Sequence, residues 1–254
     1  MIRVRDLDLY FETHGRSDAE PLVLLHGFTG TGQETFGPFI DQLGEYYRLI
    51  IPDWRGHGRT TNPSGEIVHS ELARDTAAFV TALGLTRAHF CGHSSGAMLL
   101  LFLALERPDL VHSLTLVSGT YTFDDHVKAQ VREIMTSVPL EWTEYLKTWH
   151  GETHGPNYAH IIVNLWADSV LRPDELPFTP DDLGKITCPT LIIHGDRDSF
   201  FPVYVPVTMY QAIPNAELCI LPKCGHGVPP ESPTLFVTAL LQFLTQNPFV
   251  RSSR

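Results

Sequence analysis

Short apolar runs, separated by stretches with the period of an α-helix, dominate the hydrophobic pattern of the chain. Residues 4–13 alternate between apolar and polar positions, which predicts a half-exposed strand pair. Buried parallel strands are predicted at residues 22–25, 47–51, 88–91, 114–117, 190–194 and 217–221. Core-facing helices are predicted at residues 72–83 and 235–244. Strands that alternate with helices predict an α/β fold, with a mostly parallel central β-sheet and helices on both faces.

The strand signal is absent between residues 117 and 190. Three amphipathic stripes in this interval, at residues 127–138, 142–149 and 158–166, predict three short helices. We expect residues 119–185 to form a helical cap (lid) inserted after the sixth strand, and residues 1–118 and 186–254 to form the core domain. The insertion contains three of the four tryptophans and carries 11 acidic against 5 basic residues. An aromatic underside and an acidic outer surface are therefore predicted for it.

The composition is typical of a soluble globular protein. Of 254 residues, 43% are hydrophobic and 19% charged, which excludes a disordered chain, a collagen and a coiled coil. The formal net charge of −11 argues against nucleic acid as a partner.

No apolar run approaches the roughly 20 residues that span a bilayer, and no signal peptide is visible. Four cysteines without C-x-x-C spacing favour buried, reduced thiols and a cytoplasmic location. No metal or organic cofactor is expected. A homodimer is possible, but the sequence does not determine the oligomeric state.

A G-x-S-x-G pattern, Gly92-His93-Ser94-Ser95-Gly96, lies between the predicted strand at residues 88–91 and a helical run at residues 97–105. A sharp strand-to-helix turn needs small residues on both sides of the serine. It also places the serine hydroxyl above the sheet, at the N-terminus of a helix. Ser94 is therefore predicted to be the nucleophile of a serine hydrolase.

A serine hydroxyl is a weak nucleophile at neutral pH and needs a general base. His226 is the only histidine after residue 194, and it lies in a glycine-flanked loop between the last predicted strand and the last predicted helix. A carboxylate must hold the imidazole in one tautomer, and Asp196 and Asp198 both follow the strand at residues 190–194. We prefer Asp198, because the turn that follows should place it deeper in the loop, and Asp196 is the alternative. The order Ser94, Asp198, His226 matches one known order of this triad.

Attack on an acyl carbon produces an oxyanion that needs two backbone N–H donors. We predict the amides of Ser95 and of Phe28, the latter in a glycine-containing loop at residues 26–30. His26 is interpreted as a structural hydrogen-bonding residue beneath this loop. The loop at residues 53–59, which contains Arg55 and His57, is also interpreted as structural.

These motifs, in this order over residues 20–245, resemble the α/β-hydrolase fold superfamily of the serine esterase type. Residues 32–38 and the short cap are also similar to the valacyclovir hydrolase-like carboxylesterases. The resemblance implies a carboxylic ester hydrolase. Serine at position 94, in the strand-to-helix turn, disfavours a haloalkane dehalogenase or an epoxide hydrolase, which would have aspartate there. An amino-ester hydrolase needs a carboxylate near the substrate ammonium, but Ser95 follows the nucleophile, and Asp124 and Asp125 are interpreted as a helix N-terminus.

The cap is predicted to close over Ser94, so aromatic residues near it are candidates for the substrate pocket. These candidates are Tyr121, Phe123, Trp142, Tyr145, Trp149, Tyr158 and Trp166. The expected substrates are esters with small to medium acyl or aryl groups, cleaved through an acyl-enzyme. The same triad also serves C–C bond hydrolysis, lactone hydrolysis, thioester hydrolysis and perhydrolysis. The sequence does not distinguish these reactions from ester hydrolysis. The alternative from another functional class is a ligand-sensing receptor, which retains the triad but hydrolyses its ligand slowly.

Overall fold

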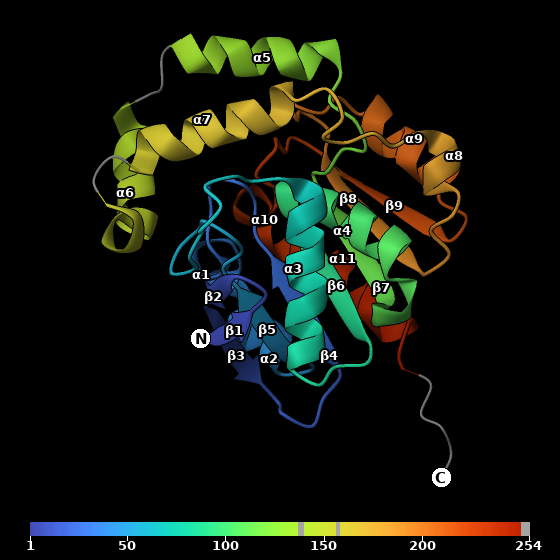
Figure 1. Cartoon of the computed structure of the whole chain (residues 1–254). Helices are drawn as coiled ribbons and strands as arrows, with labels where there is room; N and C mark the ends of the chain where they lie inside the picture. Colours follow the sequence, from blue (N-terminus) through green and yellow to red (C-terminus); the bar gives the residue numbers. More distant parts are fainter. Residues whose placement is uncertain (137–139, 156–157, 250–254) are drawn as a thin grey trace.

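The computed structural model describes residues 1–136, 140–155 and 158–249 (Figure 1). Its central sheet has seven strands in the order β3-β5-β4-β6-β7-β8-β9. β3 runs antiparallel to β5, and the other neighbouring strands are parallel. The strands are β3 (Phe11–Gly15), β4 (Pro21–Leu25), β5 (Arg48–Pro52), β6 (Ala88–His93), β7 (Val111–Val117), β8 (Thr190–Gly195) and β9 (Ala216–Leu221). The predicted mostly parallel sheet is thereby confirmed.

The N-terminal segment differs from the predicted strand pair. It forms three strands, because β1 (Ile2–Val4) and β2 (Leu7–Leu9) pair with each other in a separate antiparallel sheet, while β3 joins the central sheet. Arg5 has a φ of 53°, in the left-handed region, so the chain can reverse between β1 and β2. An alternating pattern continues across such turns and does not reveal them. The helices of the predicted cap therefore follow the seventh strand of the chain, β7, rather than the sixth.

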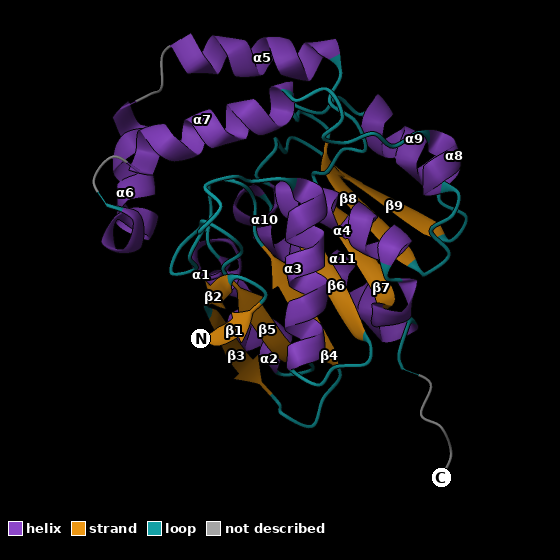
Figure 2. Ribbon diagram, in the orientation of Figure 1, coloured by secondary structure: helices purple, strands orange, loops and turns teal. Residues whose placement is uncertain are grey.

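Helices cover both faces of the central sheet (Figure 2). One face is covered by α3 (His69–Ala82), α4 (Ser95–Glu106) and α9 (Tyr204–Ala212). The other face is covered by α1 (Gly32–Phe36), α2 (Ile40–Gly44), α10 (Val228–Glu231) and α11 (Pro233–Gln246). The short elements η1 (Gly37–Phe39), η2 (Pro108–Leu110) and α8 (Pro180–Leu183) complete the connections.

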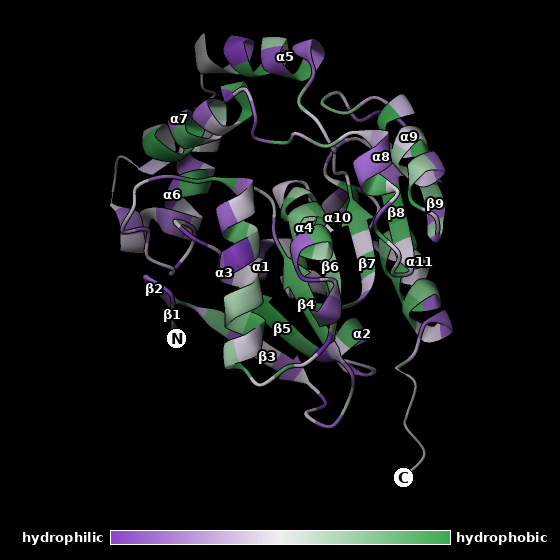
Figure 3. Cartoon of the chain, turned by 45° about the vertical axis from the view of Figure 1, so that its right-hand side comes forward, coloured by the Kyte–Doolittle hydropathy of each residue, from purple (hydrophilic) through white to green (hydrophobic). Residues whose placement is uncertain are grey.

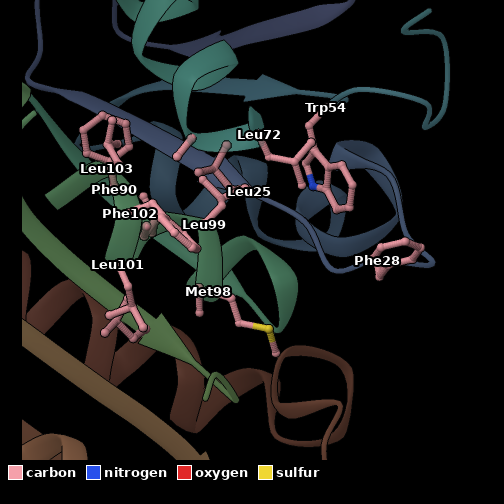
Figure 4. Close-up of a cluster of buried hydrophobic side chains, with 14 of the residues drawn as sticks. Leu25, Phe28, Trp54, Leu72, Phe90, Met98, Leu99, Leu101, Phe102 and Leu103 are labelled. Carbon is pink, nitrogen blue, oxygen red and sulfur yellow. The ribbon is translucent and has the colours of Figure 1, made fainter. Parts of the chain in front are cut away.

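Strand residues divide the core between the two faces with a period of two. In β4, Leu22 and Leu24 belong to the cluster beneath α1 and α11, whereas Val23 and Leu25 belong to the cluster beneath α3 and α4. Figure 4 shows the second cluster, where Leu25 lies among side chains of α3 and α4. Every residue of α4 from Ser95 to Ala104 is buried, and hydrophobic colouring runs through the strands and this helix in Figure 3. A parallel sheet buried on both faces accounts for the continuous apolar runs.

In the described part of the chain, the three long helices between β7 and β8 are α5 (Asp125–Thr136), α6 (Leu140–His154) and α7 (Tyr158–Leu171), and the short α8 follows them. We call the three long helices the cap helices. They lie over the end of the sheet where the parallel strands finish (Figure 1). Asp124 accepts a hydrogen bond from the Val127 amide at 3.0 Å, as an N-cap residue does. None of the helices in the described ranges has the length and apolarity to cross a bilayer.

Two of the buried polar contacts that connect the cap helices and their C-terminal connection to the core involve histidines. His150 of α6 accepts a hydrogen bond from the Gly58 amide at 2.9 Å and donates one to the Thr29 carbonyl at 3.1 Å. Glu175, beyond α7, accepts hydrogen bonds from the backbone amide of His69 at 2.7 Å and from its Nδ1 at 2.6 Å, at the start of α3. Both His69 and Glu175 are about 1–2% exposed. Breaking either contact would leave polar groups buried without partners.

Candidate active site

Ser94 occupies a strained turn between β6 and α4. Its φ of 52° and ψ of −117° lie outside the regions that L-residues prefer. Strain of this kind costs of order 1–3 kcal/mol and persists only where the surroundings enforce it. The two flanking glycines are required sterically: a Cβ at Gly92 would overlap the backbone of Gly96, and a Cβ at Gly96 would overlap the Leu25 carbonyl of β4. The Ser94 amide donates to the Val117 carbonyl at 2.8 Å and so fixes the turn to β7.

Three predicted side chains meet at this turn. His226 Nε2 lies 2.9 Å from Ser94 Oγ, and His226 Nδ1 lies 2.8 Å from Asp198 Oδ2. Ser94 follows β6, Asp198 follows β8 and His226 follows β9, so the carboxyl ends of three parallel strands bring them together. Asp196 faces elsewhere, because its Oδ1 accepts the Cys224 amide at 3.1 Å. The arrangement suits proton transfer from the serine hydroxyl to an imidazole oriented by a carboxylate.

Asp198 is buried, yet it is surrounded by donors. Its Oδ1 accepts the Phe200 and Phe201 amides at 2.9 and 3.0 Å, while Oδ2 faces His226. Burial acts to raise the pKa of Asp198, but the hydrogen bond and charge of His226 and the Phe201 amide outweigh it, so the pKa is lowered overall. Asp198 is therefore ionised at neutral pH.

His93, the residue before the nucleophile, supports the His226 loop. Its Nε2 donates to the His226 carbonyl at 3.1 Å. Burial, and then the neighbouring His226, lower the pKa of His93 to about 4, so the ring is neutral at neutral pH. The sequence gives no signal of this role, because the contact joins residues 93 and 226, which only the tertiary fold brings together.

The loop after β4 presents the Phe28 amide. The Trp54 amide donates to His26 Nε2 at 3.2 Å, so His26 Nδ1 carries the proton and donates to the Gly27 carbonyl at 2.7 Å. The Gly27 carbonyl and the Phe28 N–H share one planar trans peptide, so they point in opposite directions. His26 thus turns the Phe28 N–H away from itself. Ser95 is the first residue of α4, and its amide has no acceptor within the helix.

Two cavities meet at Ser94 and His226, and Trp166 and Phe200 line both of them. The larger, of about 260 Å³, is also lined by Phe28, Thr29, Glu34, Thr35 and Tyr145. The smaller, of about 40 Å³, is lined in addition by Met98, Phe123, Val127, Val170 and Phe201. Apart from Ser94, Ser95 and His226, the smaller cavity is lined by apolar and aromatic side chains, whereas the larger cavity also has Thr29, Glu34 and Thr35 in its wall.

The predicted pocket residues separate into two groups. Phe123, Tyr145 and Trp166 line these cavities. Tyr121, Trp149 and Tyr158 line neither: Tyr121 packs at the margin of the core, Trp149 is 36% exposed, and the Tyr158 hydroxyl donates to the Gly56 carbonyl. The Trp142 side chain lies outside the described residues.

Several cavity residues were not predicted from the sequence. Phe200 and Phe201 lie two and three residues after Asp198, so their place beside the triad loop was a usable signal. Glu34 and Met98 gave none, because α1 and α4 are distant in sequence from the cap. Among the described residues, no group of three or more His, Cys, Asp or Glu side chains is arranged to hold a metal ion.

Comparison with known proteins identifies the family. The model of the alpha/beta hydrolase family matches residues 22–239. The chain belongs to the alpha/beta hydrolase family. A putative carbamate hydrolase RutD from Agrobacterium fabrum is 30% identical to it over 266 aligned positions, which cover 93% of this chain and 98% of that protein. The human serine hydrolase BPHL is 22% identical, covering 89% of this chain and 79% of that protein.

Solved structures of other proteins share the fold of this alpha/beta hydrolase. The 2-hydroxy-6-oxo-6-phenylhexa-2,4-dienoate hydrolase (BPHD) from Rhodococcus sp. strain RHA1 superimposes with a TM-score of 0.82 and 19% identity, covering 94% of this chain and 95% of that chain. This likeness concerns the fold. Hydrolases named for different substrates share this fold, so the fold by itself does not identify the substrate.

Proposed function

We propose that this protein is a serine hydrolase that cleaves carboxylic esters with small to medium acyl or aryl groups. The observation that carries the proposal is the continuous contact from Ser94 Oγ through His226 to Asp198, at the junction of two cavities. Ser94 is the nucleophile, His226 the general base and Asp198 the orienting carboxylate. The amides of Phe28 and Ser95 form the oxyanion hole, and residues 119–185 form the cap.

The geometry supports a two-stage reaction. Ser94 Oγ attacks the ester carbonyl carbon as its proton passes to His226 Nε2, and the carbonyl oxygen becomes an oxyanion near the Phe28 and Ser95 amides. Collapse of this intermediate breaks the ester C–O bond, and His226 returns the proton to the departing alcohol. Water then attacks the acyl-enzyme, giving its proton to His226, and the second collapse releases the carboxylic acid and restores the Ser94 hydroxyl.

Carbamates are the second candidate substrates. The full-length relative at 30% identity is named a putative carbamate hydrolase, and a carbamate carbonyl reacts through the same tetrahedral geometry. The two substrates differ in the second stage, because a carbamoyl-serine is a poorer electrophile than an acyl-serine. Accumulation of the covalent intermediate is therefore the feature that separates them.

Hydrolysis of p-nitrophenyl esters from acetate to laurate by the wild type and Ser94→Ala tests the proposal. We expect turnover with a maximum at one acyl length and its loss in Ser94→Ala. The exposed Ser17→Ala variant serves as the matched control, and circular dichroism verifies folding. A p-nitrophenyl carbamate, run in parallel, should give one equivalent of p-nitrophenolate per enzyme and then stop. Sustained turnover of the carbamate alone would favour the second candidate, and full ester activity in Ser94→Ala would refute both.

A further inference from the structure

The larger cavity contains a carboxylate that the proposed reaction does not use. Glu34, on α1, lines this cavity together with Ser94 and His226. Among the described residues that line this cavity, Glu34 is the only acidic one. No Lys, Arg or His side chain of the described residues forms an ion pair with Glu34. A carboxylate without a cationic partner therefore faces the space beside the nucleophile.

The orientation of Glu34 departs from the local rule for its position. Thr31 is the N-cap of α1, and its hydroxyl accepts the Glu34 amide at 3.1 Å. In the usual capping box, the glutamate at this position turns back to the N-cap amide. The Glu34 carboxylate instead accepts the Thr35 hydroxyl at 2.9 Å and the Tyr145 hydroxyl. The Glu34 carboxylate therefore lies at the cavity wall and does not cap the N-terminus of α1.

The partners of Glu34 hold the carboxylate without neutralising it. Burial and the adjacent carboxylate raise the pKa of Tyr145, so its phenol stays protonated and donates to Glu34. Thr35 and Tyr145 are both neutral donors, and a carboxylate can accept about four hydrogen bonds, so acceptor sites remain for a ligand. His93, which also lines the cavity, is neutral. The larger cavity thus favours a positive ligand group over a neutral or negative one.

The smaller cavity has the opposite character. Beside Ser94, Ser95 and His226 it is lined by apolar side chains such as Met98 and Val127. A substrate whose carbonyl carbon lies at Ser94 Oγ therefore has one end in an apolar cavity and the other beside a carboxylate. The rings of Phe28, Trp166 and Phe200 in the larger cavity also suit a cationic amine, whose charge is attracted to aromatic faces.

We propose that Glu34, held by Thr35 and the cap residue Tyr145, makes the larger cavity a binding site for a positively charged amine. The preferred substrates are then esters with an ammonium group on one side of the scissile carbonyl and an apolar group on the other. This inference rests on the proposed ester hydrolysis at Ser94 and names its substrate class. Glu34 is a specificity-determining residue, supplied by α1 rather than by the position after the nucleophile.

Two matched pairs of esters test the inference. In the first pair, butyrylcholine is compared with the uncharged isostere in which a tert-butyl group replaces the trimethylammonium group. In the second, the p-nitrophenyl ester of γ-trimethylammoniobutyrate is compared with its tert-butyl isostere. The measured quantity is the ratio of kcat/KM for the charged and uncharged members, corrected for spontaneous hydrolysis. It is determined for the wild type, for Glu34→Gln and for Glu45→Gln, which makes the same change at an exposed residue in the turn after α2.

We expect the wild type to favour the charged member of at least one pair by about tenfold or more, because a desolvated charge pair contributes on this scale. Glu34→Gln should remove that preference, and Glu45→Gln should keep it. Equal preference in the wild type and Glu34→Gln, or no preference in either pair, would overturn the proposal for Glu34. If the uncharged esters were hydrolysed equally by the wild type and Ser94→Ala, ester hydrolysis at Ser94 would itself be wrong.

Discussion

Replacing Asp198 by Asn, with Asp196→Asn as its matched control, tests the orienting carboxylate directly. The two aspartates are two residues apart in the same loop, but only Asp198 contacts His226. Asp196 accepts the Cys224 amide, a contact that asparagine can also make through its side-chain oxygen. We therefore expect Asp198→Asn to lower kcat strongly and Asp196→Asn to change it by less than about threefold, since surface changes of this kind are worth only about 0.5 kcal/mol.

The magnitude follows from the geometry. When His226 becomes an imidazolium, its charge lies 2.8 Å from Asp198 Oδ2, measured from Nδ1. With an effective dielectric constant of about 20, two unit charges at this separation attract by about 6 kcal/mol. Asparagine keeps a dipole and part of the hydrogen bond, so the loss is smaller. A decrease in kcat of about 10³- to 10⁴-fold is expected, which matches the scale for a triad that loses its carboxylate.

The assay is steady-state hydrolysis of the best p-nitrophenyl ester from pH 6 to 9, with urea denaturation of each variant as a check on folding. Because the pKa of Asp198 is lowered, the wild-type carboxylate stays ionised throughout this range, and the deficit of Asp198→Asn should persist across it. A loss below about tenfold in a folded Asp198→Asn variant, or an equal loss in Asp196→Asn, would refute the assignment of the carboxylate.

Three further changes probe the scaffold. Glu175→Ala leaves His69 without its partner, so the free energy of unfolding in urea at pH 7 should fall by about 3–5 kcal/mol. The pKa of Glu175 is lowered in the folded protein. In the wild type, its contribution to the free energy of unfolding should therefore be fully present above the ordinary pKa of glutamate, and it should be lost as the pH falls through the lower pKa of the folded state. Gly96→Ala should abolish ester hydrolysis and lower the thermal midpoint, because the added Cβ overlaps the Leu25 carbonyl. His150→Ala should lower kcat more than it raises KM, since the Thr29 carbonyl beside the proposed oxyanion hole loses its donor; unchanged kcat would show that this contact is only structural.

The predictable parts of the molecule were those that depend on local sterics and on periodicity. Each of the six predicted buried strands corresponds to a strand of the central sheet. The turn at Ser94 could be predicted because only glycine fits at positions 92 and 96, so the sequence there records a packing requirement. The loop that contains Asp198 and the loop that contains His226 were found because parallel strands end at one edge of the sheet.

The unpredictable parts depend on contacts between distant segments. The N-terminal alternation did not reveal that β1 and β2 leave the central sheet. The aromatic stripes of the cap did not reveal which rings face Ser94, because Trp149 and Tyr145 lie on the same helix and only Tyr145 lines the cavity. Glu34 carried the signal of a helix start, and its place in the cavity follows from the fold, which brings α1 and Tyr145 of α6 to the same cavity. Periodicity identifies a buried face but not the partner of that face.

The thirteen histidines show why chemistry must be assigned from the fold. Burial lowers the pKa of His26 to about 3 and those of His93 and His150 to about 4, so these rings are neutral at neutral pH. His26, His93 and His150 each donate one hydrogen bond to a backbone carbonyl near the site. Such a ring holds a loop in place, because it stays neutral and donates its one N–H to a backbone carbonyl. His226 differs: its side chain is 24% exposed, lines both cavities and places Nε2 beside Ser94. Access to the reacting atoms, rather than the residue type, therefore distinguishes the proposed general base from the histidines that support it.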